Sequence, residues 1–194
     1  MRRWLACLFL CFAAAGFGEL RNFEKNGISY EWEEDPDFYL CKMLFSDAFI
    51  HSYSQVPLED LGFYGRASMV QKISDAFDEF YLEFKSGQSG LRWLTAKEGG
   101  VPVAALVADL SKFPGEVYIA EMAVETRRQR QGIATAMVSA LLEQLPEAAR
   151  FTVITRKANR TARAFYSAFG FIESGYTHEG YSPEWYAGYE LICP

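Results

Sequence analysis

The chain has 194 residues, half of them hydrophobic, which is enough apolar material for one domain with a full core. The formal net charge of −6 argues against a nucleic-acid-binding protein, because contacts to phosphates need a clustered basic surface. We therefore expect a single globular domain with no nucleic-acid partner.

Residues 1–18 differ in kind from the rest of the chain. Arg2 and Arg3 precede a nearly uncharged run that reaches Phe17 and ends in small residues. This is the order of a secretory signal peptide, and the run is shorter than the ~20 residues of a comfortable membrane span. An uncleaved anchor, a buried N-terminal helix and a mis-assigned start are the alternatives. We expect residues 1–18 to be a cleaved or membrane-inserting signal-like segment that can make transient contact with a membrane or translocon, and residues 19–194 to form the domain.

Two amphipathic helices are predicted after a short strand. Ile28 to Trp32 alternates apolar and polar side chains, as a half-buried strand does. Asp35-Pro36 resembles an N-cap followed by proline at the first helical position, and apolar residues then recur at helical spacing to about Tyr53. A second stripe of this spacing, from Met69 to Phe84, predicts the next helix.

Three strands are expected in the middle of the chain. Leu91 to Ala96 and Val101 to Ala108 are strand-like runs on either side of the hairpin signal Glu98-Gly99-Gly100. Pro114-Gly115 then turns the chain into a third run, Glu116 to Val124. These runs predict an antiparallel arrangement.

A basic loop and a glycine follow the third run. The loop extends from Glu125 to Gln131, and a helix opens on Gly132-Ile133-Ala134. The first backbone N–H groups of a helix are unpaired and carry partial positive charge, so they can hold a phosphate or pyrophosphate. Glycine lets the anion approach the backbone, and the arginines of the loop (Arg127, Arg128 and Arg130) add positive charge. An ordinary strand-to-helix turn with a solvated loop is the alternative.

The last third of the chain predicts a strand, a helix and two closing strands. Phe151 to Thr155 is the first strand, and Asn159 can cap a helix that Gly170 ends. Phe171 to Ser174 and Trp185 to Ile192 are the closing strands. The expected element order is β-α-α-β-β-β-α-β-α-β-β.

Two sequence motifs resemble those of the GNAT superfamily of N-acetyltransferases. Gln129, Gly132 and Ala134 fit its Q/R-x-x-G-x-G/A signature for acyl-CoA. Asn159-x-x-Ala162-x-x-Phe165-Tyr166, followed by Phe169-Gly170-Phe171, is similar to its second signature. The resemblance extends roughly from Gly27 to the C-terminus. It implies an α/β (α+β) fold with a mixed, mostly antiparallel central sheet flanked by helices.

The resemblance also implies a cofactor site and a mechanism. Acetyl-CoA would be the co-substrate, no metal would be needed, and the acetyl group would pass directly to an amine in a ternary complex. The matching cofactor contacts are Met122, Ala123, Val124, Gln129, Arg130, Gln131, Gly132, Ile133, Ala134, Thr135 and Asn159.

Two side chains match catalytic roles in the family. Glu121 would take the proton of the acceptor amine, directly or through water, with Glu116 and Tyr118 as alternatives on the same strand. Tyr166 would protonate the sulfur of coenzyme A. The alternative for Glu121 is an exposed or salt-bridged strand residue, and the alternative for Tyr166 is a core aromatic residue. A binding or regulatory module of the same fold, without turnover, is the alternative function.

The acceptor and the assembly stay open at this stage. A small amine and a protein amine both fit, and so does a homodimer. Tyrosines near the C-terminus, interleaved with glutamates, could form a pocket for a cationic amine or simply pack the closing strands. The compartment is open too, because the N-terminal segment suggests export or membrane association whereas acetyl-CoA is chiefly cytosolic.

Overall fold

The computed structural model describes residues 19–53, 57–87, 90–177 and 180–193, so the signal-like segment predicted at residues 1–18 lies outside the described residues. The described chain forms one eight-stranded sheet in the order β1-β2-β3-β4-β5-β6-β8-β7. All neighbouring strands are antiparallel except β5 and β6, which are parallel. The strands are β1 (Phe23–Lys25), β2 (Ile28–Glu33), β3 (Leu91–Glu98), β4 (Val101–Asp109), β5 (Glu116–Val124), β6 (Arg150–Arg156), β7 (Ile172–Ser174) and β8 (Tyr186–Ile192). The expected mixed, mostly antiparallel sheet is confirmed.

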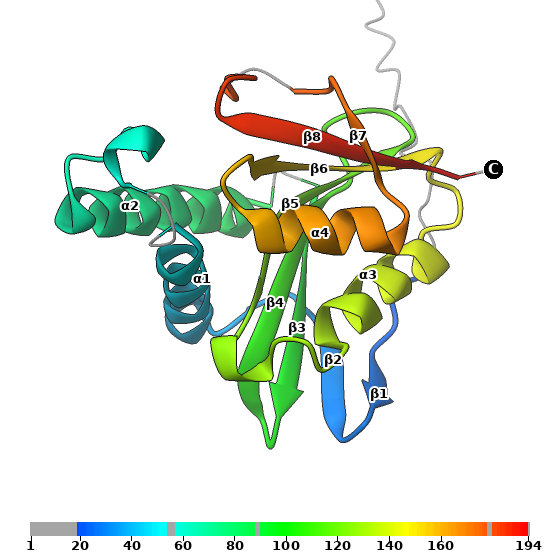
Figure 1. The fold of residues 1–194 in the computed structure, drawn as a ribbon. Coiled ribbons are helices and arrows are strands. Elements are labelled where there is room, and N and C mark those ends of the chain that lie inside the picture. Colours follow the sequence, from blue (N-terminus) through cyan, green and yellow to red (C-terminus); the bar gives the residue numbers. More distant parts are fainter. Residues whose placement is uncertain (1–18, 54–56, 88–89, 178–179, 194) are drawn as a thin grey trace, which may run out of the picture.

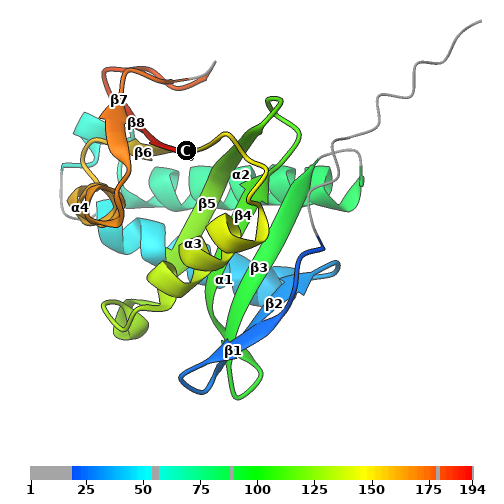
Figure 2. The same cartoon turned by 90° about the vertical axis from the view of Figure 1, so that its right-hand side faces the viewer.

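Helices cover both faces of this sheet (Figures 1 and 2). α1 (Phe38–Tyr53) and α2 (Arg66–Lys85) lie on one face, and α3 (Ile133–Gln144) and α4 (Arg160–Phe169) on the other. Each face has its own buried core: Phe45, Phe77 and Trp93 belong to the first, and Met137 and Tyr166 to the second. Two short 3-10 helices, η1 (Glu59–Leu61) and η2 (Thr126–Arg128), lie in connecting segments. None of the helices in the described part of the chain is both long and apolar enough to cross a membrane.

Two details of the N-terminal part were predicted wrongly. The described chain includes a strand that was not predicted, β1, which pairs with β2 through a turn at Asn26-Gly27. Both turn residues have positive φ angles. The first helix begins at Phe38, and its cap is Asp37, whose carboxylate accepts a hydrogen bond from the backbone N–H of Leu40 at 3.1 Å. Asp35 instead forms an ion pair with Lys85 of α2, at 2.6 Å.

The two cysteines of the described chain are free. Cys41 lies in the core under α1, and Cys193 packs against the core of the opposite face. No disulfide joins these two cysteines in this structure. Burial raises the pKa of the Cys41 thiol to about 11, so this group is a packing residue at neutral pH.

Two irregularities of β5 create the site described below. First, β5 pairs with β6 only from Glu116 to Ile119, although both strands continue further. The two strands therefore diverge, and the C-terminal half of β5 has one edge without a sheet partner among the described strands. Second, Glu121 pairs with Val107 while Ile119 pairs with the adjacent Ala108, so Ala120 is the extra residue of a β-bulge.

Candidate active site

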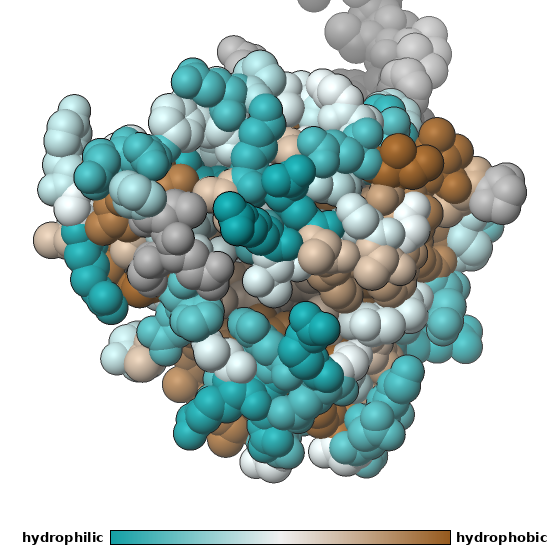
Figure 3. Space-filling model, in the orientation of Figure 1, coloured by the Kyte–Doolittle hydropathy of each residue, from teal (hydrophilic) through white to brown (hydrophobic). Residues whose placement is uncertain are grey.

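A cleft of about 810 Å³ opens where β5 and β6 diverge. It is bounded by the second half of α1, the end of β5, the loop before α3 and one side of α4. In the orientation of Figure 1 the surface is hollowed between α4 and the η2 segment below it, with hydrophilic side chains along both rims (Figure 3). The cleft-lining residues that the sequence had predicted for the cofactor are Met122, Ala123, Val124, Gln129, Arg130, Gly132, Ile133, Ala134, Thr135 and Asn159.

The loop between β5 and α3 has the backbone of an anion-binding site. Arg130 has a φ of 64° and Gly132 a φ of 81°, so both adopt the left-handed conformation that turns successive N–H groups toward one side. Gly132 is the N-cap of α3, whose first N–H groups have no partner within the helix. Backbone groups and the helix dipole thus favour negative charge at this end of the cleft.

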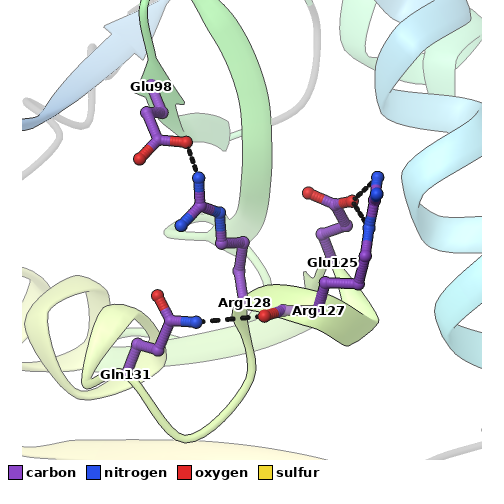
Figure 4. A network of polar contacts seen from close by, with 5 residues as sticks. All are labelled: Glu98, Glu125, Arg127, Arg128 and Gln131. Atoms are coloured by element: carbon purple, nitrogen blue, oxygen red, sulfur yellow. Dashed lines mark hydrogen bonds and ion pairs between the residues drawn. The ribbon is translucent and has the colours of Figure 1, made fainter.

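Side chains around this loop hold its shape (Figure 4). Arg127 pairs with Glu125 at 2.7 Å, and Arg128 pairs with Glu98 at the end of β3. Gln131 donates a hydrogen bond to the backbone carbonyl of Arg127 at 3.0 Å. Gln131 therefore braces the loop and is not among the cleft-lining residues, unlike the other predicted cofactor contacts.

The positive charge at the mouth is smaller than the three arginines suggested. Two of them are offset by carboxylates, and Arg127 lies outside the cleft lining. Arg130 lines the cleft and has no ion-pair partner among the described residues. The side-chain charge that can meet an anion there comes mainly from Arg130.

The free edge of β5 faces the same cleft. Met122, Ala123 and Val124 line it, beyond the last residue that pairs with β6. Across the cleft, the Asn159 side chain caps α4 by accepting a hydrogen bond from the N–H of Ala162 at 3.0 Å, as its position predicted. The edge of β5 and the capped end of α4 thus both line the cleft, together with the anion-binding loop.

The bulge at Ala120 decides which face of the sheet Glu121 occupies. Its cross-strand partner, Val107, belongs to the core under α1 and α2, whereas Ile119 belongs to the core on the other face. Regular alternation would have put residues 119 and 121 on the same face, and the extra residue reverses this. Glu121 is half-buried, and desolvation raises the pKa of its carboxyl group to about 8.

Four tyrosines lie within electrostatic reach of Glu121: Tyr53, Tyr118, Tyr166 and Tyr181. Burial is the main cause that raises the pKa of each phenol, and the negative charge of Glu121 raises these pKa values further. Tyr166 is almost fully buried, and its ring contacts those of Phe165, Phe171 and Tyr189. Neither Glu121 nor Tyr166 lines the cleft, but each is adjacent in the chain to a residue that does: Phe165 for Tyr166, and Met122 for Glu121.

The alternative bases on β5 have other surroundings. Glu116 is buried, accepts a hydrogen bond from Thr152 at 2.7 Å and pairs with Arg150 at 2.6 Å. The hydroxyl of Tyr176 donates a third hydrogen bond to it, at 3.0 Å. Glu116 is thus part of a structural network outside the cleft lining. Tyr118 is buried near Glu121, and desolvation raises the pKa of its phenol.

The sequence analysis overlooked one charged member of this region. Arg156 is the last residue of β6, beyond the point where β5 and β6 diverge. Its guanidinium group is surrounded by three aromatic rings, those of Tyr53, Phe63 and Tyr186. Residues from four distant parts of the chain meet here, and no local pattern in the sequence indicates their association.

Comparison with known protein families identifies the family of this chain. Residues 57–171, more than half of the chain, match the sequence model of the acetyltransferase (GNAT) family. The chain belongs to the GNAT family of acetyltransferases. No curated protein matches this GNAT acetyltransferase in sequence.

Solved structures share its fold. The PaiA N-acetyltransferase from Thermoplasma acidophilum, in complex with coenzyme A, is 11% identical with a TM-score of 0.66, over 84% of this chain and 99% of that one. The ribosomal-protein-S18-alanine N-acetyltransferase from Escherichia coli is 17% identical with a TM-score of 0.58, over 86% of this chain and 94% of that one. An acetyltransferase from Thermus thermophilus is 13% identical with a TM-score of 0.54, over 84% of this chain and 96% of that one. At these identities the likeness establishes the fold.

Proposed function

We propose that this GNAT acetyltransferase transfers an acetyl group from acetyl-CoA to a primary amine, by direct attack in a ternary complex. The observation that carries the proposal is the cleft beside the diverging strands, which is lined by an anion-binding loop and by the edge of β5 next to Glu121, a half-buried carboxyl group of raised pKa. The PaiA N-acetyltransferase, which shares this fold, is in complex with coenzyme A, which supports coenzyme A as the kind of ligand.

The pyrophosphate would bind to the backbone N–H groups between Arg130 and Thr135, with Arg130 adding charge. The pantetheine arm would then run along the free edge of β5, opposite Asn159. The amides of Met122 and Val124 would donate hydrogen bonds to this arm and to the acetyl oxygen. Such fixed donors stabilise the negative charge that develops on the carbonyl oxygen, without a covalent enzyme intermediate.

Glu121 and Tyr166 would handle the protons. The neutral amine attacks the thioester carbon, a C–N bond forms and the C–S bond breaks. Glu121 takes the proton of the amine, and Tyr166 supplies a proton to the departing thiolate and regains one from solution. The two groups are coupled, because the charge of Glu121 raises the pKa of Tyr166. Once Glu121 is protonated this charge is gone, and Tyr166 becomes a better acid when its proton is needed.

The first test is calorimetric titration of acetyl-CoA and coenzyme A into residues 19–194, followed by thiol release with a panel of amines. We expect binding, and thiol release that depends on the amine. Glu121→Gln and Tyr166→Phe should lower the transfer rate while leaving coenzyme A affinity nearly unchanged. Binding without turnover on any amine would favour a binding module, and absence of binding would overturn the assignment of the loop.

A further inference from the structure

Arg156, at the end of β6, occupies an aromatic cage. Its guanidinium carbon lies 5.2 Å from the ring centre of Tyr53, 5.4 Å from that of Phe63 and 4.9 Å from that of Tyr186. These rings come from the end of α1, the α1–α2 connection and the start of β8. The ring of Tyr181 packs edge-on against Tyr186 at 4.9 Å and extends the cage toward Glu121, whose charge raises the pKa of Tyr181.

Among the described residues, no carboxylate pairs with the positive charge in this cage. The Arg156 Nη1 group donates a hydrogen bond to the backbone carbonyl of Leu61, at 3.3 Å. The Nε group is buried and has no hydrogen-bond partner within the described part of the chain. A half-buried guanidinium without a counter-ion is costly unless something else supplies the negative charge.

The rings hold the flat faces of the guanidinium and use only part of its hydrogen-bonding capacity, through the side chain of Tyr53. Aromatic rings attract the flat faces of a guanidinium group, whereas its N–H groups point outward in the plane. The cage therefore fixes the orientation of Arg156 and leaves N–H groups for an anion. A planar guanidinium matches a carboxylate through two parallel hydrogen bonds, which makes a carboxylate a better fit than a phosphate for a single arginine.

Both charges act on the same side chain. The pKa of Tyr53 is raised first by burial, lowered by the charge of Arg156 and by a hydrogen bond with it, and raised by the charge of Glu121, so both charges act on this hydroxyl. The region thus has one acidic and one basic end, separated by tyrosines. An acceptor with a single positive charge would match only the acidic end.

On this geometry, and resting on the proposed function, we infer that the acceptor is a free amino acid, whose carboxylate binds Arg156 while its amine faces Glu121. The charges fix the direction of binding, because the reversed acceptor would put its amine against the Arg156 guanidinium and its carboxylate against the Glu121 carboxyl group. A protein N-terminus has an amide where a free amino acid has its α-carboxylate, so its backbone would leave Arg156 uncompensated.

The test compares paired acceptors. Thiol release from acetyl-CoA is measured with the standard amino acids and with ω-amino acids of increasing length, each beside its carboxamide. We expect the best acid to exceed its amide by roughly 10- to 100-fold in kcat/KM, since a hydrogen-bonded charge pair contributes that much. Arg156→Gln should abolish this preference, mainly by raising KM for the acid, and Arg156→Lys should keep part of it. Arg92→Gln, at an exposed position of β3, is the matched control and should retain it.

A second measurement does not depend on turnover. The N-acetyl forms of the same acids and of their amides are titrated calorimetrically into the complex with coenzyme A. Tighter binding of the acid in the parent protein, but not in Arg156→Gln, supports the inference even if no amine is acetylated, in which case the transferase proposal alone fails. Equal binding of acid and amide, or a preference that survives in Arg156→Gln with coenzyme A affinity intact, would overturn the inference.

Discussion

Glu121 and Glu116 lie on the same strand, yet their carboxylates have opposite surroundings. Glu116 accepts hydrogen bonds from Arg150, Thr152 and Tyr176, which tie it into a buried polar network. Glu121 faces tyrosines, and desolvation raises its pKa to about 8. A carboxyl group of this kind can take a proton near neutral pH, which an ordinary glutamate does poorly.

This difference predicts distinct outcomes for the two amide variants. In the parent protein kcat/KM should rise with pH through about 8, as Glu121 ionises. Glu121→Gln should lose this rising limb of the profile of kcat/KM against pH, and about 100-fold or more of the rate. Glu116→Gln should keep the limb but lower the free energy of unfolding by about 1–3 kcal/mol, because it weakens a buried, charged hydrogen-bond network. Rate assays across pH and urea unfolding check both, and a Glu116→Gln variant that loses the limb would contradict the assignment of the base.

At the level of elements, the loop before α3 combines a glycine in the left-handed conformation with an open helix end. Gly132 has a φ of 81°, and an added Cβ would meet no atom within 4 Å. Gly27, in the β1–β2 turn, has a φ of 75° and equally open surroundings. Substitution should therefore cause the same backbone strain at both positions. They differ because only Gly132 lies at the proposed binding site of the cofactor pyrophosphate.

Alanine variants of these glycines separate strain from binding. Gly132→Ala and Gly27→Ala should each lower the free energy of unfolding by about 1 kcal/mol, since an L side chain disfavours positive φ. Only Gly132→Ala should weaken coenzyme A binding, by about tenfold, because its methyl group lies where the pyrophosphate meets the backbone. Denaturation and calorimetry measure the two effects. Equal coenzyme A affinity in both variants would remove the loop from the cofactor site.

The same elements show what a sequence can predict. Periodic apolar residues and turn glycines predicted the four α-helices and all the described strands except β1, whose signal, Asn26-Gly27, was present but overlooked. Asn159 was identified as a cap because capping is local. The bulge at Ala120 depends on how β5 pairs with β4. The cage of Arg156 depends on how four distant segments meet. Neither feature therefore leaves a local pattern in the sequence.

At the scale of the whole molecule, the raised pKa of Glu121 makes stability depend on pH. The carboxyl group titrates near 4.5 as a free side chain and near 8 in the folded protein. Between these values the folded state holds a proton that the unfolded state has released, so the free energy of unfolding falls as pH rises through this window. Above about 8 both states are ionised and this contribution is flat.

Glu121→Gln should remove this dependence, because an amide does not titrate. We expect the variant and the parent to be similarly stable near pH 4.5 and the variant to become more stable toward pH 8, by a slope below the limit of about 1.4 kcal/mol per pH unit, since Glu121 is partly accessible to water. Urea unfolding at several pH values gives the difference, and subtraction cancels the groups that titrate alike in both proteins. The lowered pKa values of Glu31 and Glu173 act below this window, and the raised pKa of Cys41 acts above it. A difference that stays constant from about pH 5 to about pH 8 would mean that Glu121 ionises normally in the folded state, and would remove the physical reason for choosing it as the base.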